Sequence, residues 1–150
     1  MPPETEILSD LIRVKRECLQ QLRDMGEKQM SFIAAGDMTS LMGLLAAKHR
    51  PLNTLKRIEK SLDPFRRQDP EKRVWRSREE RARCAKQLQE CEALLAEIVD
   101  QEKHCKAELM QRRDETARRL QGTHLASHAR EAYGPQGNNL PSQIDLFSGK

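Results

Sequence analysis

The chain has 150 residues, of which 33% are charged and only 3% are aromatic, and its formal net charge is +4. This length fits one domain, and the shortage of aromatic residues disfavours a β-sheet, because sheet faces are rich in aromatic and β-branched side chains. No apolar run approaches the ~20 residues that span a membrane, and the first residues lack the pattern of a secretory signal. We therefore expect a cytoplasmic protein without membrane insertion.

The fold class that this composition predicts is all-α, an elongated antiparallel helical bundle or coiled coil of three long helices. The first helix is expected at residues 4–35, where apolar residues recur every three or four positions and Lys15 and Gln29 interrupt the stripe. Gly36 suits the left-handed position after a helix, and Asp37 can cap the next one. A hairpin turn is therefore predicted at Gly36-Asp37.

The second helix is expected at residues 38–62, where leucines keep the same spacing. Pro51 lies inside this range and removes one backbone donor, which favours a kink or a short break. Asp63-Pro64 is expected to end the helix, because the residue before a proline avoids the helical conformation.

The third helix has two start signals. Asp69-Pro70 offers an Asp cap followed by a proline in the first turn, and Ser77 with Glu80 fits a capping box. The helix therefore begins at Pro70 or eight residues later, and we assign it residues 70–132.

The apolar stripe of this third helix weakens along its length. Glu102 is a polar member of the stripe, which turns polar after Leu109 and becomes apolar again at Leu120. We leave open whether residues 121–123 interrupt the helix.

Two regions follow from these patterns. Residues 1–133 are predicted to form the helical bundle. Residues 134–150 are rich in Gly, Pro, Asn and Ser and have no helical period, so we predict a flexible tail there.

The residues able to carry chemistry do not form a catalytic pattern. The chain has four cysteines, Cys18, Cys84, Cys91 and Cys105. The last three are spaced by seven and fourteen residues, which predicts buried thiols along a packing seam rather than a zinc site. His124 and His128 are four residues apart, but no further ligand set accompanies them. Because no phosphate loop, nucleophile elbow or paired-carboxylate cleft is found, we predict no enzymatic activity, no metal and no cofactor.

Basic residues are concentrated in residues 56–86, with Phe65 and Trp75 among them. Such a mixture can bind nucleic acid. Acidic residues interleave with the basic ones, however, and no recognised binding motif is present. The favoured interpretation is that the two aromatic residues close the end of the bundle, and nucleic-acid binding is the least favoured function.

Amphipathic character is the strongest functional signal. Where the third helix extends past the other two, its stripe has no covering partner, and an exposed apolar stripe is a binding surface. We predict that Leu109, Met110, Leu120 and Leu125 bind a partner protein. The alternative is that they form a homodimer contact in a coiled-coil structural or oligomerisation protein.

The segment from Ile33 to Lys48, IAAGDMTSLMGLLAAK, resembles the helix–turn–helix of the FlgN family of flagellar export chaperones. Asp37 and Lys48 match the family's Gly-Asp turn and the lysine that follows it in the second helix. A long third helix ending at Tyr133, followed by a Gly-rich tail, also matches. The chain departs from the family in its basic charge and in Pro51.

This resemblance implies a chaperone of the flagellar type III export system. Such a chaperone binds the C-terminal helical segments of hook–filament junction proteins and delivers them to the export gate. The family's client contact lies in its C-terminal helix, which corresponds here to the region from Leu109 to Leu125. A tyrosine near the end of that helix serves gate docking in the family, and Tyr133 is the matching position; a local packing cap is the alternative role.

Overall fold

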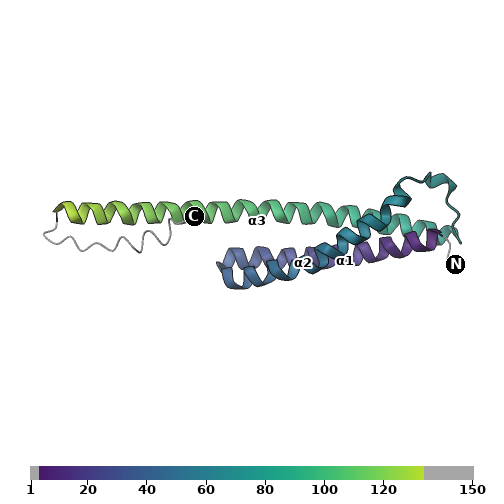
Figure 1. Cartoon of the computed structure of the whole chain (residues 1–150), viewed down its shortest axis with the longest axis horizontal. Coiled ribbons are helices and arrows are strands. Elements are labelled where there is room, and N and C mark those ends of the chain that lie inside the picture. Colours follow the sequence, from purple (N-terminus) through teal and green to yellow (C-terminus); the bar gives the residue numbers. More distant parts are fainter. Residues whose placement is uncertain (1–3, 134–150) are drawn as a thin grey trace. The chain divides into compact units, whose positions relative to one another are not determined.

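The computed structural model describes residues 4–133, whose elements are α1 (Glu4–Ala35), α2 (Met38–Arg66), the 3-10 helix η1 (Pro70–Lys72) and α3 (Arg78–Tyr133) (Figure 1). The described residues contain no strand, so the all-α fold class is confirmed. Each described helix is too polar or too short to cross a membrane. The tail predicted at residues 134–150 lies outside the described residues.

The chain divides into two compact units, one up to Lys106 and the other from Ala107 onward. The first unit holds α1, α2, η1 and the first half of α3. The second holds the rest of α3, which continues through residues 121–123 without the interruption that the sequence left open. The two units are described separately below.

The hairpin between α1 and α2 is the one predicted from Gly36-Asp37. Gly36 has a φ of 71°, in the left-handed region that glycine adopts without a Cβ penalty. Its N–H donates to the Ile33 carbonyl at 3.0 Å, and the Asp37 N–H donates to the Phe32 carbonyl at 2.9 Å, which closes α1. The Asp37 carboxylate accepts from the Ser40 N–H at 3.1 Å and caps α2.

The end of α2 differs from the sequence prediction. The helix is continuous through Pro51 and Pro64 and ends at Arg66, so the predicted stop at residue 62 and the short break considered at Pro51 were wrong. The last turn is held by two side chains beyond the predicted stop. Phe65 packs against the hydrophobic core, and the Arg66 guanidinium donates to the Asp63 carboxylate at 2.8 Å.

The start of α3 also differs from the assigned range of 70–132. Asp69 and Pro70 open only the single turn of η1, and α3 begins at Arg78. The hydroxyl of Ser77 accepts from the Glu80 N–H at 3.1 Å, which satisfies one of the free donors of the first turn. The second of the two start signals is therefore the one that begins the long helix.

The residues between η1 and α3 are tied to the rest of the first unit, which explains why the first start signal does not extend. The Arg73 guanidinium donates to the Phe65 carbonyl at 2.7 Å, and the Thr5 hydroxyl donates to the Val74 carbonyl at 2.8 Å. These contacts hold residues 73 and 74 against α2 and α1. A helix through the same residues would break both contacts.

The core of the first unit is built from the apolar stripes of all three helices. All four cysteines are buried and none forms a disulfide, and for the last three this agrees with their predicted spacing along the seam. Burial of aliphatic side chains and thiols supplies the main driving force for packing. The core cluster comprises Leu8, Ile12, Cys18, Leu19, Leu22, Ile58, Leu62, Cys84, Cys91 and Leu94.

Candidate functional site

A buried lysine joins the three helices of the first unit. Lys48 on α2 is only 8% exposed, and its Nζ donates to Gln29 Oε1 on α1 at 2.9 Å and to Glu102 Oε1 on α3 at 2.5 Å. In the sequence pattern, Gln29 and Glu102 are separate polar positions in the apolar stripes of the first and third helices. The structure brings them together on one ammonium group, so Lys48 acts in packing.

The predicted client-binding residues lie in the second unit, on α3. Leu109 and Leu120 are half-buried, while Met110 and Leu125 are exposed. At 3.6 residues per turn, Leu109 and Leu120 share one face, Met110 lies about 100° around the helix from Leu109, and Leu125 lies about 140° from Leu120. The four side chains therefore spread over more than one face of the helix.

The surroundings of these four side chains are polar and open. Among residues 107–132 of α3, no residue is buried. Thr116 and Thr123 each donate a hydroxyl hydrogen bond to the carbonyl four residues earlier, on Arg112 and Arg119, at 2.9 Å. These threonines use their hydroxyl protons within the helix, so the aliphatic side chains are the groups there that gain most from a partner.

Tyr133 is the last residue of α3. The structure describes its backbone and not its side chain, so its predicted docking role stays a prediction. His124 and His128, nine and five residues earlier, pack edge to face with ring centroids 4.6 Å apart. Within residues 4–133, no group of three or more His, Cys, Asp or Glu side chains is placed to hold a metal ion.

Several large apolar residues of the first unit are exposed, although the sequence assigned most of them to buried stripes. Leucines that were counted as stripe members on α2 and α3 are roughly two-fifths exposed, between 37% for Leu45 and 46% for Leu95. A helical period shows which residues share a side of the helix but not how far the neighbouring helix covers that side. The exposed residues on these helices are Met38, Met42, Leu45, Leu52, Leu88, Leu95 and Val99.

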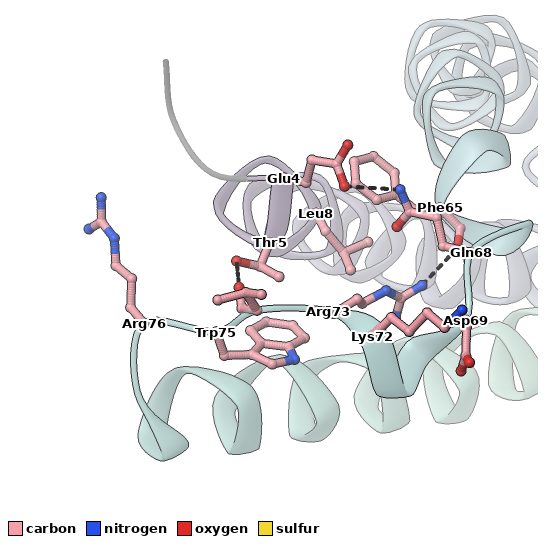
Figure 2. A pocket seen from close by; sticks show the side chains of 11 residues that line it. Glu4, Thr5, Leu8, Phe65, Gln68, Asp69, Lys72, Arg73, Trp75 and Arg76 are labelled. Carbon is pink, nitrogen blue, oxygen red and sulfur yellow. Dashed lines mark hydrogen bonds between the residues drawn. The ribbon is translucent and has the colours of Figure 1, made fainter.

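Phe65 and Trp75 close one end of the first unit, as the favoured interpretation of the basic region predicted. Both rings pack against the core cluster, and both line a cavity of about 500 Å³ beside the start of α1 (Figure 2). Nearby basic groups have partners within the chain. Arg76 forms an ion pair with Glu6 at 3.0 Å, and Arg66 forms one with Asp63 at 2.8 Å. The aromatic rings are therefore used for packing, and part of the positive charge is neutralised internally.

A family model described as FlgN protein matches residues 1–141. The comparison with curated proteins and the comparison with solved structures returned no match. The matched range contains the Gly36-Asp37 hairpin, Lys48 and the whole of α3.

Proposed function

Because the chain belongs to the FlgN family, whose members are flagellar export chaperones, we propose that it binds the C-terminal helical segments of hook–filament junction proteins in the cytoplasm and delivers them to the flagellar export gate. The observation that carries this proposal is the exposed aliphatic side chains on α3 after Lys106. No residue between 107 and 132 is buried. Covering a surface of this kind with a partner lowers the free energy, because apolar side chains leave water.

Client capture would proceed by packing one helix on another. An amphipathic client segment packs its apolar side chains against Leu109 and Leu120, with further contacts to Met110 and Leu125 around the helix. Full burial of a leucine or methionine contributes about 1.5–3 kcal/mol, and these side chains are already partly covered, so each adds less than that. A client segment that is disordered when free would become ordered on this surface.

Export-gate docking is assigned to Tyr133 at the end of α3. A phenol has an apolar ring that a partner can bury and a hydroxyl group that forms a hydrogen bond at its edge. Replacement of Tyr133 by Ala is expected to weaken binding to the gate while client binding is kept. Tyr133→Phe separates the contribution of the ring from that of the hydroxyl group.

The client contact is tested by fluorescence anisotropy with labelled C-terminal segments of the junction proteins and the full chain. Leu125→Glu places a charge at a 61% exposed site and is expected to weaken binding without disturbing folding. Ala126→Glu, one residue along and on another face, is the matched control and should bind as the parent chain does. Absence of binding at concentrations on the order of tens of micromolar, equivalent to a binding free energy of about 6 kcal/mol, contradicts the proposal.

A homodimer through the same residues of α3 is the competing function. Leu109, Met110, Leu120 and Leu125 have the exposure that a self-associating coiled coil would also need. Analytical ultracentrifugation separates the two, because a stable dimer that buries this surface leaves no room for a client. A monomer that becomes a 1:1 complex on addition of the client segment supports the chaperone.

A further inference from the structure

We infer that the seam between α2 and α3 in the first unit is a docking groove for an amphipathic helix whose apolar face is flanked by acidic side chains. This inference rests on the proposed function, because the helix would belong to the client segment. It adds a second contact surface, separate from the side chains of α3 after Lys106.

The contact between Lys48 and Glu102 marks where α2 and α3 meet. Residues three, four or seven positions apart lie on the same side of a helix. Leu52, four residues after Lys48, therefore lies beside this line on α2. Leu95 and Val99, seven and three residues before Glu102, lie beside it on α3.

Aliphatic side chains therefore flank both sides of the seam. Leu52, Leu95 and Val99 are 41%, 46% and 44% exposed. Leu45, three residues before Lys48, repeats the position of Leu52 after two turns, and Leu88 repeats that of Leu95. Two rows of half-covered aliphatic residues on adjacent antiparallel helices are the kind of surface into which a third, amphipathic helix packs.

A cavity of about 260 Å³ lies between α1, the end of α2 and the start of α3. Leu62 and Phe65 of α2 and Leu88 of α3 contribute to its walls, so it joins the row of aliphatic residues through Leu88. Its other lining residues include Arg73 and Arg81. A hollow with apolar walls and basic groups accepts a bulky apolar side chain next to a carboxylate.

The charge of α2 identifies the chemistry of the partner. No Asp or Glu occurs between Met38 and Ile58, whereas His49, Arg50, Lys56 and Arg57 are exposed there, and the remaining basic residue, Lys48, already pairs with Glu102. The next acidic residue, Glu59, is already occupied by Lys15 at 2.7 Å and by Arg66. A docked helix is therefore attracted when acidic side chains lie along its α2 flank.

The test measures anisotropy of fluorescein-labelled C-terminal segments of the junction proteins with the full chain. The double variant Leu52→Glu/Leu95→Glu is expected to weaken binding by about tenfold or more, since it removes two apolar contacts and repels an acidic flank. Ile7→Glu alters a similarly exposed aliphatic residue on α1, 42% exposed, and should leave binding unchanged. Circular dichroism at matched concentration verifies that each variant is folded.

The outcomes separate the groove from the proposed function. If the double variant binds like the parent chain while Leu125→Glu weakens binding, the groove is wrong and the chaperone function stands. If the parent chain binds no segment, both fall.

Trp75 provides a second measurement that needs no variant. It is the chain's single tryptophan and lines the cavity at the end of the seam. Its emission must shift when the parent chain is saturated with the segment. Unchanged emission at saturation overturns the groove even if the double variant fails to fold.

Discussion

Lys48 on α2 and Glu102 on α3 form an ion pair at 2.5 Å inside the first unit, and the same ammonium group also donates to Gln29 on α1. Lys48 and Gln29 are 8% and 4% exposed. A lysine this far from water requires partners, because an unpaired buried charge costs several kcal/mol. The contact therefore favours the one register of the three helices in which these polar positions meet.

Replacing Lys48 by Met tests this role. The substitution keeps an unbranched apolar side chain but leaves Gln29 Oε1 buried without its donor, which costs about 1–3 kcal/mol of unfolding free energy. The double variant Lys48→Met/Gln29→Leu should regain part of the loss, since both polar partners are then replaced by apolar ones.

The measurement for these variants is urea denaturation followed by circular dichroism. Lys56→Met, an exposed lysine two turns along α2, is the control and should change the unfolding free energy by no more than about 0.5 kcal/mol. If Lys48→Met and Lys56→Met changed the unfolding free energy equally, burial of Lys48 would have no energetic consequence.

Local signals in the sequence predicted the hairpin but not the length of every helix. Gly36 and Asp37 specify their turn through their own backbone preferences and hydrogen bonds, so tertiary contacts need not be known. The end of α2 is different. Pro64 signals a stop, yet Phe65 gains contact with the core and Arg66 gains two carboxylate partners, and the helix continues to Arg66.

The candidate sites were predictable to a similar extent. Leu109 and Leu120 were expected on the third helix, and they lie on α3, while their role in client binding stays a prediction. The exposure of Leu52 and Leu95 was not predictable, because periodicity does not say how far a neighbouring helix covers a stripe. Nor does it reveal that Gln29 and Glu102 meet, since that depends on the register between helices.

Gly26 allows the close approach of α1 and α3. A Cβ built on Gly26 would lie 2.0 Å from Gln101 Oε1, and Gln101 Nε2 donates to the Arg23 carbonyl at 3.1 Å. Gly26→Ala is therefore expected to displace the Gln101 carboxamide and lose that hydrogen bond, at about 1 kcal/mol, a cost that opposes the gain in helix propensity. Thermal and urea unfolding measure the net effect.

Gly43 on α2 provides the matched control for Gly26. No atom lies within 4 Å of a Cβ built there, so Gly43→Ala should stabilise the chain by about 0.5–1 kcal/mol through helix propensity alone. The combination Gly26→Ala/Gln101→Ala should be more stable than Gly26→Ala, because the clash is removed. If Gly26→Ala and Gly43→Ala stabilise equally, the approach of Gln101 does not limit packing.

Glu59 makes stability depend on pH on the acid side. Burial alone would raise its pKa, but hydrogen bonds from Lys15 and Arg66 outweigh burial and hold the Glu59 pKa below its ordinary 4.5. A lowered pKa in the folded state stabilises the fold above the unfolded value, and that contribution is lost as the pH falls through the folded value. The unfolding free energy of the parent chain should therefore decline below pH 4.5.

Glu59→Gln isolates this contribution. The variant should be less stable than the parent chain near pH 7, and the difference between them should shrink as the pH falls below 4.5. Glu27→Gln, at an exposed position on α1, is the control, and its unfolding free energy should stay close to that of the parent chain at both pH 7 and pH 3. A difference between Glu59→Gln and the parent that is the same at pH 7 and pH 3 would contradict the assignment.

The buried cysteines should react only when the first unit unfolds. Burial raises the pKa of the Cys18, Cys84 and Cys91 thiols above the ordinary 9.0, which lowers the fraction of reactive thiolate, and Cys105 is 2% exposed. Iodoacetamide labelling at pH 8, followed by mass spectrometry across a urea series, should show all four sites modified together along the unfolding curve. A cysteine that is labelled in the absence of urea would have an accessible thiol and would contradict its place in the packing seam.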